Sequence, residues 1–172
     1  MRTLKLTIAY DGTRYAGWQL QGKRQKSKGK SEKPTIQGTL EEVLGRILQE
    51  PVRVVGSGRT DAGVHAEAQV AHVNTRSAIP CSRLLRSVNA LLPADIAVTR
   101  LEALRRPFHA RFDAATKRYR YRIYTGPVVP PFIRSYVHHV SAPLNVSLMR
   151  REAASCSGAH DFQAFARRRG AG

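Results

Sequence analysis

The sequence is poor in cysteine and has no long apolar run. Its 172 residues include two cysteines, Cys81 and Cys156, which supply neither a disulfide framework nor the paired ligands of a zinc site. We therefore expect both thiols to be reduced and structural, and we expect no metal site. No apolar stretch approaches the roughly 20 residues that a membrane-spanning helix needs.

The first residues also lack the apolar core of a signal peptide. The segment 1–6 alternates polar and apolar side chains instead. Together with the scarcity of cysteine, this favours a cytoplasmic protein without a membrane partner.

Acidic residues are scarce relative to basic ones. There are 12 Asp and Glu against 29 Lys and Arg, a formal net charge of +17. A positive field of this size attracts polyanions, of which nucleic acids are the commonest. The most basic stretch, Lys23–Lys33, has no apolar periodicity, so we predict a loop there that either contacts a polyanion or is only solvated.

Hydrophobic periodicity predicts six elements in residues 1–105. They are strands at 3–10, 52–55, 69–75 and 96–101, and helices at 36–48 and 82–92, the second with Ser82 as N-cap. The order β-α-β-β-α-β is that of the split-βαβ, ferredoxin-like plan. We therefore predict an α+β fold, with an antiparallel sheet and helices on one of its faces.

A second unit of the same kind is predicted to begin in residues 106–172. Alternation predicts a strand at 117–125, with Tyr119 on one face and arginines on the other. A strand at 136–140 and a helix at 145–157 follow, with Asn145 as N-cap and Gly158 at the helix end. These elements lack partners within the sequence, so we expect this second unit to be incomplete.

The glycine-punctuated loop 56–65 contains the best candidate for chemistry. Asp61 lies among small residues, where a large substrate can reach its carboxylate. We expect Arg59 to keep Asp61 ionised by charge proximity, and an ionised carboxylate is a nucleophile toward a sugar or an electron-poor base carbon. The three glycines are expected to permit unusual backbone conformations and close approach of a ligand. A surface turn with a salt bridge accounts for the same residues, so both interpretations stay open.

The segment Gly58–Ala66 resembles the signature loop of the tRNA pseudouridine synthase A family. Four further blocks resemble that family in the same order. They are Tyr10–Thr13 with Gly17–Gln19, Thr35–Gln37 with Leu40–Glu41, Phe108–Phe112 with Arg118–Tyr121, and Gly158 with His160–Phe162. The resemblance covers nearly the whole chain.

The resemblance implies a role for three residues. Asp61 corresponds to the family's nucleophile, Tyr119 to the tyrosine that stacks on the substrate, and Arg59 to the arginine that helps hold the flipped nucleotide. The family isomerises uridine to pseudouridine in the anticodon arm of tRNA, without cofactor or metal, as a homodimer. A basic surface for phosphates and an aromatic for the extruded base are what such a reaction requires.

Two alternatives remain at this stage. One is an RNA-binding module on a ferredoxin-like sheet, although its usual basic-Gly-aromatic pattern is missing from the sequence. The other is an inactive fragment, because family members continue beyond the last block and complete the cleft there. His65, His109 and His160 are expected to make hydrogen bonds within loops, and not to perform catalysis.

Overall fold

The computed structural model describes residues 1–19 and 33–165 and divides the chain into two compact units, 1–118 and 119–172. The basic loop Lys23–Lys33 lies outside the described residues except for Lys33. Residues 106–118 pack with the first unit, and the predicted division into domains at residue 105 stays a prediction.

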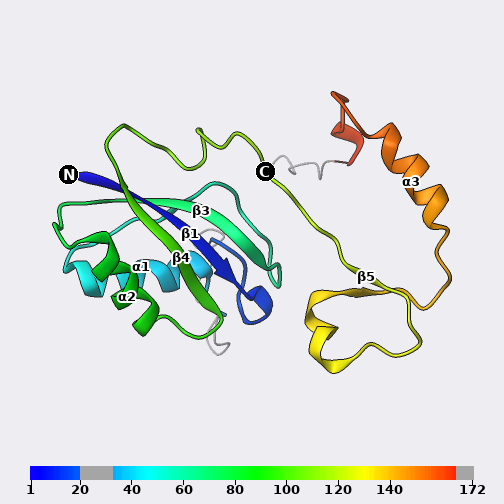
Figure 1. Ribbon diagram of the computed structural model, residues 1–172, viewed down its shortest axis with the longest axis horizontal. Coiled ribbons are helices and arrows are strands. Elements are labelled where there is room, and N and C mark those ends of the chain that lie inside the picture. Colours follow the sequence, from blue (N-terminus) through cyan, green and yellow to red (C-terminus); the bar gives the residue numbers. More distant parts are fainter. Residues whose placement is uncertain (20–32, 166–172) are drawn as a thin grey trace, which may run out of the picture. The chain divides into compact units, whose positions relative to one another are not determined.

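The first unit is built on a four-stranded antiparallel sheet (Figure 1). Its strands are β1 (Arg2–Tyr10), β2 (Val55–Gly56), β3 (Ala66–Thr75) and β4 (Ile96–Leu104), in the spatial order β2-β3-β1-β4. β1 lies between β3 and β4 and is antiparallel to both. With two helices packed against the sheet, the α+β class is confirmed.

Two helices, α1 (Ile36–Leu48) and α2 (Cys81–Leu91), lie on the same side of the sheet (Figure 1). The core between sheet and helices consists of aliphatic side chains with no exposed surface. Its central members are Leu4, Leu6, Ile8, Leu40, Leu44, Leu84 and Val88. Full burial of one such side chain stabilises the fold by about 1.5–3 kcal/mol, so the alternation of β1 and the helical stripes together account for this layer.

The helix ends follow local chemistry, with one correction. Thr35 caps α1 by accepting a hydrogen bond from the backbone N–H of Gly38 at 3.1 Å, and α1 ends at Gln49 in a left-handed conformation. The prediction of Ser82 as the N-cap of α2 was wrong. Pro80 occupies that position, and no side chain caps the first turn of α2.

β2 is shorter than the predicted strand at 52–55. Only Val55 and Gly56 pair with β3. The backbone N–H of Val54 donates instead to the Glu41 carboxylate on α1 at 2.9 Å, so it is not available to a neighbouring strand. A carboxylate from helix α1 thus takes the place of one backbone hydrogen bond of the sheet.

The segment 106–113 packs on part of the sheet face away from the helices, at His72 of β3. His72 alternates along β3 with the core residues Ala71 and Val73, so it lies on this other face, and it is 5% exposed. The backbone N–H of Ala110 donates to His72 Nδ1 at 3.1 Å, and the Phe108 ring meets the His72 ring edge-on. This segment therefore anchors the Phe108–Phe112 block onto β3.

The second unit contains short elements. β5 (Ile123–Tyr124) and β6 (His138–His139) form a parallel pair, and α3 (Val146–Ser155) follows, with Asn145 as its N-cap as predicted. Short 3-10 turns occur at Pro131–Tyr136 and Gln163–Phe165.

The predicted strand at 117–125 was wrong in extent. Residues 117–122 are irregular, and Tyr119 and Tyr121 are 66% and 88% exposed. An alternating sequence forms a strand only where a neighbouring strand satisfies its backbone groups. In the described part of this unit, such pairing begins at Ile123.

Candidate active site

The loop between β2 and β3 is fastened first at its β2 end. The backbone N–H of Ser57 donates to the Val70 carbonyl at 2.8 Å, and the side-chain amide of Gln69 donates to the Gly58 carbonyl at 2.8 Å. The Ser57 hydroxyl also contacts the Gln69 side chain at 2.7 Å. β3 therefore fixes the start of the loop before the chain reaches Asp61.

Thr60, the residue before Asp61, is held by the segment that follows β1. Its carbonyl accepts the backbone N–H of Trp18 at 2.9 Å, and its hydroxyl lies 2.9 Å from the hydroxyl of Tyr10. Gly17 approaches so closely that a Cβ there would lie 2.5 Å from the Thr60 carbonyl oxygen. The opening block of the sequence and the signature loop thus form one substructure.

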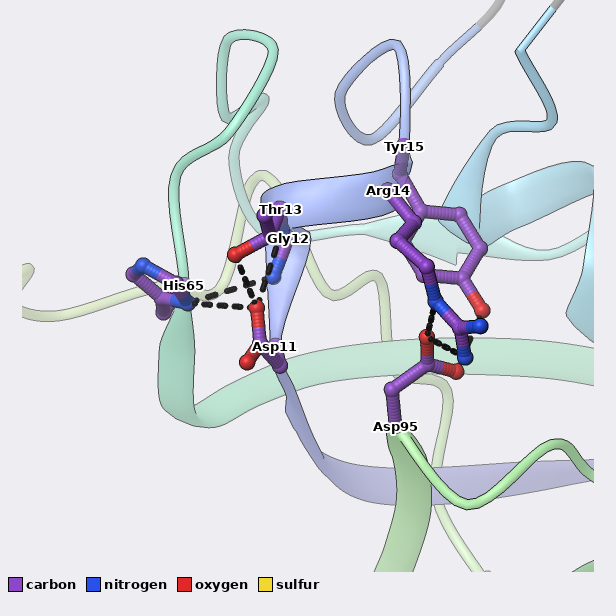
Figure 2. Close-up of polar contacts among 7 residues, drawn as sticks. All are labelled: Asp11, Gly12, Thr13, Arg14, Tyr15, His65 and Asp95. Atoms are coloured by element: carbon purple, nitrogen blue, oxygen red, sulfur yellow. Dashed lines mark hydrogen bonds and ion pairs between the residues drawn. The ribbon is translucent and has the colours of Figure 1, made fainter. Parts of the chain in front are cut away.

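The far side of Asp61 is held by the turn after β1. The Val64 N–H donates to the Asp61 carbonyl at 3.2 Å, which closes a tight turn through Gly63 at φ +80°. Beyond it, Nδ1 of His65 lies 3.1 Å from the Asp11 carboxylate (Figure 2). Asp61 therefore lies between two anchored points of the backbone.

Asp61 itself is exposed, as is Arg59. No ion pair joins these two side chains in the ranges 1–19 and 33–165, and the expectation that Arg59 keeps Asp61 ionised stays a prediction. The backbone of Thr60 is pinned between them, and its two charged neighbours remain at the surface. A carboxylate presented in this way is accessible to a large substrate.

The three glycines of the loop meet different structural requirements. Only Gly63 has a left-handed backbone. A Cβ on Gly56 would lie 2.6 Å from the Trp18 ring, so the close approach there is by an indole and not by a ligand. A Cβ on Gly58 would find ordinary contact with Lys117, whose Nζ lies 3.5 Å away. The sequence interpretation missed Trp18 and Lys117 as neighbours of the loop.

A second polar cluster fixes the turn that holds His65 (Figure 2). Arg14 Nη2 forms an ion pair with the Asp95 carboxylate at 2.7 Å, and the Tyr15 hydroxyl donates to the other Asp95 oxygen at 2.6 Å. Burial alone raises the pKa of Asp95, but the Tyr15 and Arg14 contacts outweigh it and lower that pKa. Burial and then the Asp95 hydrogen bond raise the pKa of Tyr15. No local sequence signal linked Asp95 to this turn.

Tyr119 is the first residue of the second unit, where its ring is 66% exposed. The three histidines make the loop contacts that the sequence predicted. His65 contacts the Asp11 turn, His109 Nδ1 accepts the Phe112 N–H at 3.3 Å, and His160 lies 2.6 Å from the Ser157 carbonyl.

Within residues 1–19 and 33–165, no group of three or more His, Cys, Asp or Glu side chains is arranged to hold a metal ion. Both cysteines are free thiols. No helix in the same ranges has the length and apolar character needed to cross a bilayer.

Known proteins match this chain along most of its length. The sequence model of the tRNA pseudouridine synthase family matches residues 6–113, which include the anchored loop and both turns around it. The chain belongs to the tRNA pseudouridine synthase family. Proteins named tRNA pseudouridine synthase A from Moorella thermoacetica and Oleidesulfovibrio alaskensis are 44% and 46% identical to it, each over 96% of this chain. The protein of that name from Geobacter sulfurreducens is 46% identical over 165 residues.

The chain spans less than two thirds of the length of these tRNA pseudouridine synthase relatives. It covers 64% of the Moorella protein, 59% of the Oleidesulfovibrio protein and 64% of the Geobacter protein. The family match ends at residue 113, so it includes Arg59 and Asp61 but not Tyr119. Tyr119 lies within the alignments to individual relatives, which span 96% of this chain.

Proposed function

We propose that this protein isomerises uridine to pseudouridine in tRNA, with Asp61 as its nucleophile. The observation that carries the proposal is the exposed carboxylate of Asp61 on a loop anchored at Thr60 and at His65, within the segment that matches the family. The names of the relatives support tRNA as the substrate.

The reaction moves the uracil without adding or removing atoms overall. The bond between N1 and the ribose C1′ breaks, a bond between C5 and C1′ forms, C5 loses a proton and N1 gains one. A carboxylate nucleophile provides a transient covalent partner, at C1′ or at C6, while the base turns. A loop held on both sides keeps the carboxylate at a fixed distance from a bound base. Holding two reacting groups close together and correctly oriented raises the reaction rate.

We assign binding of the tRNA to basic and aromatic residues. Arg59 lies exposed two residues before Asp61 in the sequence, and we assign it to holding the extruded nucleotide. Tyr119 is the aromatic assigned to stack on the uracil, and its 66% exposed ring is available to a base. The net charge of +17 supports attraction to tRNA phosphates.

Several finer points of the proposal follow from the family. We assign the first unit to the ferredoxin-like fold, which the β-α-β-β-α-β element order and the strand order β2-β3-β1-β4 support. The target is the anticodon arm, the working assembly is a homodimer, and the location is the cytoplasm. The chemistry requires no cofactor, because the isomerisation is neither a redox nor a group-donor reaction.

The proposal is tested by incubating the purified protein with unmodified tRNA transcripts. Nucleoside analysis detects pseudouridine, and primer extension after carbodiimide treatment places it along the RNA. We expect pseudouridine in the anticodon arm. Binding of tRNA without any pseudouridine would refute isomerisation by this chain and leave both the RNA-binding module and the inactive fragment as explanations. Pseudouridine outside the anticodon arm would refute the assigned target.

A further inference from the structure

His65 forms the far anchor of the loop that carries Asp61. Its Nδ1 atom lies 3.1 Å from Asp11 Oδ1 and 3.3 Å from the backbone nitrogen of Gly12 (Figure 2). Both the His65 and the Asp11 side chains are 30% exposed, so the contact is partly shielded from water. The proposed function uses this contact only as an anchor of the loop and assigns no role to the His65 side chain itself.

The two neighbours of Nδ1 suit different protonation states of the ring. When Nδ1 carries a proton it donates to the Asp11 carboxylate, and when it does not it accepts the N–H of Gly12. Each form of the imidazole therefore has a partner on the same turn. The contact between His65 and this turn does not depend on one tautomer.

Asp11 is itself tied to two other parts of the first unit. Its Oδ1 accepts hydrogen bonds from the backbone N–H and the hydroxyl of Thr13, at 2.9 and 2.6 Å. Its own backbone N–H donates to the Asp95 carbonyl at 2.9 Å, just before β4 begins. The partner of His65 is therefore fixed to the sheet at the ends of β1 and β4.

Packing reinforces this anchor. Gly12 lies against the loop so closely that a Cβ on it would come within 2.0 Å of the Val64 carbonyl oxygen. Gly12 is buried, and the backbone of Gly63 and Val64 lies directly against it. The other anchor of Asp61 lies on the opposite side of the loop, at Thr60.

We propose that His65, acting through Asp11, is a positioning residue that sets where Asp61 stands relative to the bound uridine. The inference rests on the proposed function, in which Asp61 is the nucleophile. Small displacements of a reacting group cost large factors in rate, whereas tRNA affinity comes mainly from phosphate contacts. Loss of the His65 contact is therefore expected to lower kcat and to leave KM nearly unchanged.

Two substitutions at the same position separate positioning from packing. His65→Leu removes the polar atom, and His65→Asn keeps an amide near the position of Nδ1. We expect His65→Leu to lower kcat about ten-fold or more and His65→Asn to remain within about three-fold of the unsubstituted protein, with KM for tRNA within about two-fold in both. His160→Leu is the matched control, because His160 also makes a loop contact, at the Ser157 carbonyl in the second unit.

Hydrogen exchange of the loop amides supplies a readout that does not require turnover. We expect exchange in the peptide 58–66 to speed up about ten-fold in His65→Leu, with α1 unchanged. Equal kcat in His65→Leu and the unsubstituted protein, or unchanged exchange in 58–66, overturns the positioning role. If the unsubstituted protein forms no pseudouridine, the proposed function fails, and the exchange experiment still decides whether His65 fixes the loop.

Discussion

The hydroxyl of Tyr10, at the end of β1, lies 2.9 Å from the hydroxyl of Thr60, the residue directly before Asp61. Tyr10 is 5% exposed and its ring packs against Trp18, so this contact joins the loop to the edge of the core. A core aromatic therefore fixes the residue directly before the candidate nucleophile, Asp61.

The first prediction concerns that contact. Tyr10→Phe removes one hydrogen bond and leaves the ring, so it should lower the free energy of unfolding by about 0.5–1.5 kcal/mol. Urea unfolding measures the change. Tyr121→Phe is the matched control, because Tyr121 is 88% exposed and should show no change. Equal effects of the two substitutions would mean that the contact with Thr60 does not stabilise the fold.

The second prediction distinguishes two glycines of the loop. Gly56→Ala should destabilise the protein by about 1–3 kcal/mol, because the new methyl group would overlap the Trp18 ring. Gly58→Ala adds a methyl at an ordinary distance from Lys117 and should have little effect. Thermal unfolding of both variants tests this, and a larger loss in Gly58→Ala than in Gly56→Ala would contradict the observed packing.

The third prediction concerns acid stability. Burial, and then the nearby His109, lower the pKa of His72 from its ordinary value of 6.5, and unprotonated Nδ1 accepts the Ala110 N–H. The unfolded chain therefore binds a proton more readily than the folded one. The stability that neutral His72 provides is complete above pH 6.5 and is lost as the pH falls toward the lowered folded pKa.

Urea unfolding between about pH 8 and about pH 5 tests this linkage. His72→Asn keeps an acceptor near the Nδ1 position but does not titrate in this range, so it should flatten the acid loss relative to the unsubstituted protein. An identical pH profile in the two proteins would remove His72 as a source of the acid sensitivity.

The fourth prediction concerns the basic loop Lys23–Lys33 and tRNA. Binding should weaken steeply with salt, since lysines and arginines displace counterions from the RNA backbone. Deleting residues 23–30 should make the slope of log affinity against log salt shallower if the loop contacts RNA. An unchanged slope would indicate a loop that is only solvated.

The sequence predicted the first unit well because its signals were local. The alternation of β1 and the apolar stripes of α1 and α2 indicate directly which faces are buried, whereas the cap at Thr35 was not predicted. The helix α2 begins at Cys81 after Pro80, so Ser82 lies inside the helix and does not cap it. The alternation at 117–122 failed because pairing depends on a neighbour that periodicity does not reveal.

The candidate site was predicted in part. The loop and Asp61 were visible as a motif, but the anchors were not, because they join residues far apart in the chain. Trp18 bonds to Thr60, Asp95 bonds to Asp11 and Arg14, and His72 bonds to Ala110, and each pair is far apart in the sequence. The expectation that Arg59 keeps Asp61 ionised by charge proximity stays a prediction, because no ion pair joins the two side chains in the described residues.

The most direct test of the nucleophile is single-turnover release of tritium from tRNA labelled at uracil C5. We predict that Asp61→Asn lowers the release rate by about a thousand-fold or more while tRNA affinity stays within about three-fold, because a nucleophile contributes to chemistry and little to binding. Glu42→Gln, which removes one exposed negative charge from α1, should release tritium at the rate of the unsubstituted protein. Release by Asp61→Asn at a rate comparable to Glu42→Gln would contradict the assignment of Asp61.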